Sequence, residues 1–196
     1  MTEIFTAEGK AHPATVIQVG PVVVTQIKTK EKDGYSAVQF GYGVKRESLM
    51  KKAQKGHFKE LGNLRHTREV RVKDAKATIP ERGAKIDVTA FKEGDKVTVV
   101  AISKGKGFQG VVKRHHFKGG SRTHGQKHSE REAGAIGGGA RAGGRVAKGI
   151  RMAGRMGSDR VTTKNLQVLG VDEATGKIYI RGSIPGRRGT LVEISG

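Results

Sequence analysis

The residues best suited to metal or acid–base chemistry in this sequence are four histidines, His115, His116, His124 and His128. A divalent metal site would need three or four such ligands that converge in a packed shell. The spacing of these four is irregular, and lysine or arginine flanks nearly every one, which would repel a cation. Histidines in such surroundings ordinarily stack on bases or donate hydrogen bonds to phosphates. We therefore expect no metal here and a role that faces RNA.

A second candidate for chemistry is Gly105–Gly110, which reads GKGFQG and matches the GxGxxG pattern of dinucleotide-binding turns. Such a site needs a long apolar helix after the turn and a surrounding βαβ unit. The residues that follow, 111–116, are basic and lead back to glycine, so neither requirement is met. The glycines fit a hinge instead, where positive φ and a close backbone approach to a phosphate chain are needed. We expect no cofactor.

Catalytic groups are also sought among Ser121, Ser129, Glu130 and Glu132, which lie near the histidines. No nucleophile elbow or oxyanion hole accompanies them, and a glycine-rich polycation is a poor frame for holding reacting groups in place. The chain has no cysteine, which excludes disulfides, thiolate zinc sites and cysteine nucleophiles. The sequence therefore predicts no enzyme, no catalytic residue and no small-molecule substrate.

The charge of the chain is its most informative feature. Its 196 residues include 38 lysines and arginines against 18 acidic residues, a net charge of +20. Residues 104–160 carry 14 basic and three acidic side chains, a net +11, together with 15 of the 30 glycines. A solvated surface would mix signs, whereas the eight arginines here suit bidentate phosphate contacts and stacking on bases. This segment is expected to bind structured RNA, with duplex DNA or chromatin as the alternative.

An anionic membrane is the other polyanion that could neutralise such a charge. It would favour a basic amphipathic helix with tryptophan on its apolar face, and the chain has no tryptophan. The longest apolar run, around Val22–Val24, is far too short to cross a bilayer, and the N-terminal sequence lacks a signal-peptide core. We expect no membrane partner and a cytoplasmic protein. The predicted RNA-binding residues are Lys104, Lys106, Lys113, Arg114, His115, His116, Lys118, Arg122, His124, Lys127, His128, Arg131, Arg141, Arg145, Lys148, Arg151, Arg155 and Arg160.

The elements that must position these side chains are predicted to be mainly β. Alternating or β-branched runs predict strands at 14–19, 22–29, 36–42, 67–72, 85–88, 96–103, 161–171, 177–181 and 190–194. A small helical or loop insertion is predicted near residues 45–65. The simplest architecture is an antiparallel β-barrel, built from residues 1–103 and 161–196, with residues 104–160 inserted between strands as a long glycine-rich basic arm. An arm so poor in apolar residues is expected to be disordered alone and to order on RNA.

Several linked motifs along the chain resemble one known family. They include SKGKGFQGVVKR at Ser103–Arg114, VTQIKTKEKDGYSAVQFGYG at Val24–Gly43, GHF at Gly56–Phe58, KGIRMAGRMG at Lys148–Gly157 and GSIPG at Gly182–Gly186. In this order they resemble the third protein of the large ribosomal subunit in its bacterial form. The resemblance implies a β-barrel of the translation-protein type and an arm that reaches through rRNA toward the peptidyl transferase centre. It also implies early assembly on the 3′ domain of the large rRNA, neighbouring ribosomal proteins as partners, and no catalysis.

Two departures from the family pattern stand out. Family members usually have a further short segment ahead of the residues that correspond to Met1 and Thr2, so on this resemblance the chain begins late or at an internal start. The tip of the arm, Gly138–Gly143, reads GGARAG and lacks the modifiable glutamine and the proline that many members carry. We therefore expect no glutamine methylation. A free regulatory or chaperone-like RNA-binding factor is the alternative to a ribosomal protein, and co-sedimentation with large subunits would separate the two.

Overall fold

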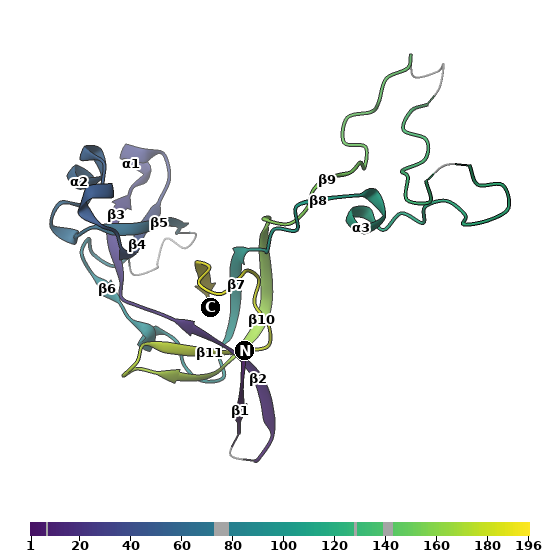
Figure 1. Cartoon of the computed structure of the whole chain (residues 1–196). Coiled ribbons are helices and arrows are strands. Elements are labelled where there is room, and N and C mark those ends of the chain that lie inside the picture. Colours follow the sequence, from purple (N-terminus) through teal and green to yellow (C-terminus); the bar gives the residue numbers. More distant parts are fainter. Residues whose placement is uncertain (7, 73–78, 128, 139–142) are drawn as a thin grey trace. The chain divides into compact units, whose positions relative to one another are not determined.

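The structure, a computed structural model, describes residues 1–6, 8–72, 79–127, 129–138 and 143–196, which form two compact units (Figure 1). Unit one consists of residues 1–97, 165–183 and 196, and unit two of residues 98–164 and 184–195. Two strands, β7 (Lys96–Ile102) and β10 (Arg160–Asp172), contribute residues to both units.

The first sheet of unit one is antiparallel and runs in the order β1-β2-β11-β10. Its first three strands in this order are β1 (Thr2–Phe5), β2 (Ala11–Gln18) and β11 (Lys177–Arg181), and β2 and β11 each have a neighbour on both sides. Successive side chains of a strand face opposite sides, and β11 follows this rule, with Ile178 and Ile180 fully buried between exposed or half-buried neighbours. Burying each such side chain contributes about 1.5–3 kcal/mol. Alternation in the sequence therefore accounts for the core of this sheet.

The second sheet of unit one is also antiparallel and has the order β5-β4-β3-β6. The strands are β3 (Val22–Lys28), β4 (Ala37–Val44), β5 (Leu64–Arg71) and β6 (Lys85–Ile86). The register between β3 and β4 shifts between Val24 and Gln26, which leaves one extra residue as a β-bulge. The chain therefore bends where β3 passes beside the helical insertion.

Short helices accompany this second sheet. They are α1 (Lys30–Asp33), η1 (Glu47–Leu49), α2 (Lys52–Phe58), η2 (Lys59–Leu61) and η3 (Val88–Ala90). The start of α2 is capped because the side chain of Gln54 accepts the backbone N–H of Lys51 at 3.4 Å. Its end is anchored by Phe58, which is buried.

Unit two combines a strand pair with the basic segment. Strand β12 (Val192–Ser195) pairs antiparallel with β7, and the inward side chains of β7 in this unit, Val99 and Ala101, are buried. The basic segment contains two short strands, β8 (Phe108–Gln109) and β9 (Gly154–Arg155), which pair with each other, and the helix α3 (Val111–His115). The remaining described residues between α3 and β9 form turns and irregular chain.

The structure confirms the mainly β, antiparallel class, and each predicted strand overlaps an observed one. Within residues 45–65, where a helical or loop insertion was predicted, the structure has η1, α2 and η2. The predicted closed barrel is wrong. In the part of the chain that the structure describes, β1 pairs with β2 alone, β12 with β7 alone and β5 with β4 alone, so the sheets have open edges. The physical reason is that β3, β4, β5 and β6 pair with one another and form a separate sheet.

Candidate nucleic-acid interface

The basic segment begins and ends in a paired stretch, residues 103–115 and 152–160, which we call the stalk. The backbone N–H of Ser103 donates to the carbonyl of Asp159 at 2.9 Å, and the N–H of Asp159 donates to the Ser103 hydroxyl oxygen at 3.2 Å. Further along, Lys106 N–H donates to the Met156 carbonyl at 2.9 Å and Met156 N–H donates to the Gly107 carbonyl at 3.0 Å. These bonds continue into the β8–β9 pair, so the two sides of the stalk are hydrogen-bonded to each other on both sides of a short strand pair.

Gly157 allows the two sides of the stalk to approach this closely. Gly157 has φ +76°, in the left-handed region that favours glycine, and a Cβ there would overlap the carbonyl oxygen of Lys104. The sequence predicted close approach by glycines in this region, but to a phosphate chain. The structure shows that at Gly157 the approaching group is the backbone of the opposite side of the stalk.

The far end of the stalk is closed by α3. The guanidinium of Arg114 donates from Nη1 to the carbonyl oxygen of Met152 at 2.7 Å, and His115 Nε2 lies 3.1 Å from the same oxygen. Gly154 makes room for this arrangement, because a Cβ there would lie 2.7 Å from Arg114 Nη1. Val111 anchors α3 and is buried. Arg114 and His115 are half-buried and bind the protein itself.

Beyond the stalk, residues 116–151 form the part of the segment that we call the distal loop. One small closure is present, where Gly120 N–H donates to the Glu130 carbonyl at 2.8 Å and the Glu130 carboxylate lies 3.3 Å from Nε of Arg122. The side chain of Arg122 nevertheless remains 87% exposed, so this surface pair contributes little to stability. In Figure 1 the described residues of the distal loop follow α3 as irregular chain.

The predicted RNA-binding residues are nearly all on the surface. Fourteen of them are exposed: Lys104, Lys106, Lys113, His116, Lys118, Arg122, His124, Lys127, Arg131, Arg145, Lys148, Arg151, Arg155 and Arg160. Arg114 and His115 are half-buried, and His128 and Arg141 lie outside the described residues. The structure gathers the cations on one continuous segment, and their assignment to RNA stays a prediction.

Comparison with known proteins identifies the family. The model of the family described as "Ribosomal protein L3" matches residues 48–177. The protein named "Large ribosomal subunit protein uL3" of Herpetosiphon aurantiacus is 49% identical over 196 residues, covering 100% of this chain and 91% of that protein. Proteins of the same name from a Synechococcus species and from Cutibacterium acnes are 47% and 45% identical, covering 100% and 99% of this chain and 91% and 86% of theirs.

The chain belongs to the ribosomal protein L3 family. Identity extends along the whole chain, so the resemblance predicted from the motifs is confirmed. The family is structural and non-enzymatic, which confirms the prediction that the chain is not an enzyme.

The GxGxxG match has a clear structural explanation in this L3-family chain. Gly107 has φ +69° at the turn into β8, and Gly110 is the N-cap of α3, which is only five residues long. The pattern therefore builds the stalk. Among the described residues no group of histidines and carboxylates could hold a metal ion, and no helix in that part of the chain is long and apolar enough to cross a membrane.

Sequence reasoning missed two features of the stalk. Phe108 is 76% exposed and pairs in register with Arg155, which places an aromatic ring beside a cation, an arrangement suited to stacking on bases. The carbonyl of Met152 is the acceptor that fixes Arg114, and no local pattern marks it because the two residues are 38 positions apart. A single aromatic residue among glycines and lysines was the available signal for Phe108.

Proposed function

We propose that this chain is a structural constituent of the large ribosomal subunit that binds large-subunit rRNA through its stalk and distal loop. Membership of the L3 family gives the chain a structural role in the large subunit, in the cytoplasm. The rRNA contact itself is supported by the surface of residues 104–160. Fourteen predicted cationic or histidine side chains are exposed there on a segment with a net charge of +11.

The division into stalk and distal loop supports a specific mode of binding. The stalk is held by its own hydrogen bonds, so it fixes where the basic chain leaves the sheets before any RNA is present. The distal loop has few such bonds and adapts to the RNA surface, where its arginines and lysines neutralise phosphates. In this mode the stalk sets direction and the loop supplies most of the attraction.

We further propose that the loop reaches toward the peptidyl transferase centre and that binding occurs early in subunit assembly, beside neighbouring ribosomal proteins. These roles rest on the family resemblance, and the high density of arginine and glycine supports them. Glycine lets a backbone pass through crowded RNA where a Cβ would clash, and arginine bridges phosphates of different RNA helices.

Binding of large-subunit rRNA should be measured across a salt series for the full chain and for a variant that lacks residues 104–160. Each phosphate contact contributes about 0.7–0.9 to the slope of log affinity against log salt. We expect deletion to flatten this slope sharply and to prevent salt-resistant co-sedimentation with large subunits. Binding with an unchanged slope would contradict the proposal, and circular dichroism of the shortened chain controls for loss of the sheets.

A further inference from the structure

A pocket of about 410 Å³ lies in unit one. It is lined by residues of β3 and α2, by Lys59 of η2 and by Arg82, which lies ahead of β6. Three of its lining residues are basic or can become so: His57, Lys59 and Arg82. No acidic residue lines it. This concentration of cationic groups is separate in the chain from the stalk and the distal loop.

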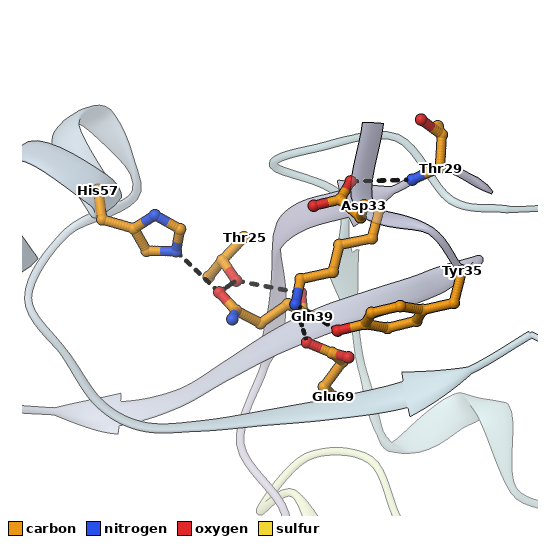
Figure 2. A network of polar contacts seen from close by, with 8 residues as sticks. Thr25, Thr29, Asp33, Tyr35, Gln39, His57 and Glu69 are labelled. Carbon is orange, nitrogen blue, oxygen red and sulfur yellow. Dashed lines mark hydrogen bonds and ion pairs between the residues drawn. The ribbon is translucent and has the colours of Figure 1, made fainter. Parts of the chain in front are cut away.

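Two residues that line the pocket, Thr25 and His57, are joined by hydrogen bonds to the side chain of Gln39 (Figure 2). The hydroxyl of Thr25 donates to the side-chain oxygen of Gln39 at 2.8 Å, and Nε2 of His57 lies 2.8 Å from the same oxygen. This contact with an amide oxygen holds the imidazole in one orientation. Thr25 is 1% exposed, which makes it a buried polar side chain with its hydrogen bond satisfied.

A β-bulge in β3 lies at this network and changes which side chains face the pocket. Thr25 is the extra residue of the β-bulge, since Val24 pairs with Phe40 and Gln26 pairs with Gln39. A bulge re-aims side chains that a regular strand would place on alternate faces. Here Thr25, Gln26 and the next residue all line the pocket, which a regular strand would not allow.

One of the two cations, Arg82, is held by the end of α2. Arg82 donates from Nη2 to the carbonyl oxygen of His57 at 3.2 Å, which fixes its guanidinium there. Lys59 follows α2 with φ 38°, a backbone conformation that residues other than glycine rarely adopt and that clusters at binding sites. Among the residues that the structure describes, no carboxylate forms an ion pair with Lys59 or Arg82. Their charges remain available to a partner.

Gly56 gives the strongest indication that the partner lies outside the chain. It sits inside α2 and lines the pocket, and its φ is not in the left-handed region. A Cβ at this position would meet no atom within 4 Å, so neither backbone conformation nor internal packing requires glycine. Glycine in a helix interior is unfavourable relative to alanine. A side chain at this position would project into the open space beside the pocket.

We propose that this pocket binds a backbone phosphate of the large-subunit rRNA, as a contact site independent of residues 104–160. The inference rests on the proposed function for its choice of RNA. A phosphate oxyanion fits a site with one anchored guanidinium, a lysine beside it on the pocket lining and an oriented imidazole, and the open side at Gly56 allows the sugar–phosphate chain to pass close to α2. The distal loop supplies adaptable contacts, and the pocket supplies one whose geometry is set in advance.

The test uses the full chain and measures both stability and rRNA binding. Gly56→Ala should raise the stability of the free chain because alanine favours the helix, and should weaken rRNA binding because the methyl group occupies the open side. Lys59→Gln with Arg82→Gln should lower the affinity roughly tenfold and reduce the salt slope by about 0.7–0.9, the contribution of one phosphate. The matched control, Lys52→Gln with Lys85→Gln, removes two exposed charges that do not line the pocket and should change affinity little.

The outcomes separate this inference from the proposed function. If the full chain binds rRNA while Gly56→Ala and the Lys59/Arg82 variant bind with unchanged affinity and slope, the pocket is not an RNA site and the function stands. Failure of the unaltered chain to bind rRNA contradicts the proposed function itself. Hydroxyl-radical footprints should show one protected rRNA site lost in the pocket variants. Unchanged footprints with reduced incorporation of another ribosomal protein would mean that the pocket binds a protein, which overturns the assignment.

Discussion

The second sheet of unit one and the distal loop both present cations, but they hold them by different means. At the sheet, Arg82 is bound to the carbonyl of His57, and His57 to Gln39, so each group has a position before any ligand arrives. In the distal loop, Arg122 keeps 87% of its side chain exposed despite a carboxylate partner, and the other described cations are exposed as well. His57 and Arg82 are exposed too, so the two regions differ in the contacts that orient the groups and not in exposure.

This difference suggests two roles for the cations of this protein: one set positions a phosphate, and the other attracts phosphates without a fixed geometry. Fixed cations select a geometry, because a partner must bring its phosphate to them. Under the proposed function, exposed cations on irregular chain contribute attraction that any nearby phosphate can satisfy, and we expect them to become ordered on the RNA. On this account the free energy of folding comes mainly from the sheets and the stalk, and the free energy of RNA binding mainly from the distal loop.

The largest effect is expected in the core of the first sheet. Ile180→Ala should lower the free energy of unfolding by about 2–5 kcal/mol, because Ile180 is fully buried and the vacated space cannot be refilled. Val146→Ala in the distal loop, at a side chain that is 45% exposed, should change it by less than about 0.5 kcal/mol. Urea denaturation followed by circular dichroism measures both. Equal costs would mean that the distal loop is part of the folded core.

A smaller effect is expected in the stalk from Gly157→Ala. The substituted residue would carry the strain of positive φ, about 1–2 kcal/mol, and its Cβ would also overlap the Lys104 carbonyl. Gly149→Ala is the matched control, since Gly149 has φ +85° but open space around it. Hydrogen exchange at the amides of Lys106 and Met156 should accelerate in the first variant and not in the second. The same rates in both would show that the stalk does not depend on the close approach.

Removing the guanidinium that closes the stalk should have a more modest effect. Arg114→Ala deletes a charged donor to the Met152 carbonyl and should weaken the stalk by about 1–2 kcal/mol. Arg151→Ala removes an exposed arginine from the adjoining loop and serves as the control. Limited proteolysis between residues 108 and 115 should become faster only in the first variant. Equal cleavage would mean that the bond from Arg114 to the Met152 carbonyl does not stabilise the stalk.

The smallest effect concerns an ion pair at the second sheet. Lys28 Nζ lies 2.6 Å from the Glu69 carboxylate, and this hydrogen bond lowers the pKa of Glu69 below 4.5, with a further hydrogen bond from Tyr35. A lowered pKa means that the stabilisation is present above pH 4.5 and is lost as the pH falls through the folded-state value. Glu69→Gln should therefore unfold with a shallower acid dependence than the unaltered chain. Identical pH profiles below 4.5 would show that the pair contributes nothing.

The sequence predicted the sheets well because their signal is local. Alternation at residues 96–102 and 177–181 specifies which side chains are buried, and β7 and β11 follow it. The composition of residues 104–160 likewise predicted exposed cations without requiring a fold. Closure into a barrel was predicted wrongly, because which strand edges meet depends on pairings between distant segments.

The stalk and the pocket were outside the reach of sequence reasoning for a related reason. The bond from Arg114 to Met152 spans 38 residues, and the network of Thr25, Gln39 and His57 depends on a bulge that shifts the register by one position. Neither leaves a periodic signal. The one available clue was Gly56, the single glycine inside a run of helix formers, whose significance appears only when the space around it is known.

The central claim is that exposed cations of the distal loop provide most of the attraction to rRNA, and charge neutralisation within an intact fold tests it most directly. The test variant changes six exposed loop residues to glutamine: Arg122, Lys127, Arg131, Arg145, Lys148 and Arg151. The control changes six exposed lysines of the sheets and short helices in the same way: Lys30, Lys32, Lys52, Lys85, Lys92 and Lys96. The slope of log affinity against log salt should fall by about 4–5 in the test variant and by much less in the control. Equal losses of slope in the two variants would contradict the claim and show that the chain binds rRNA through its overall charge.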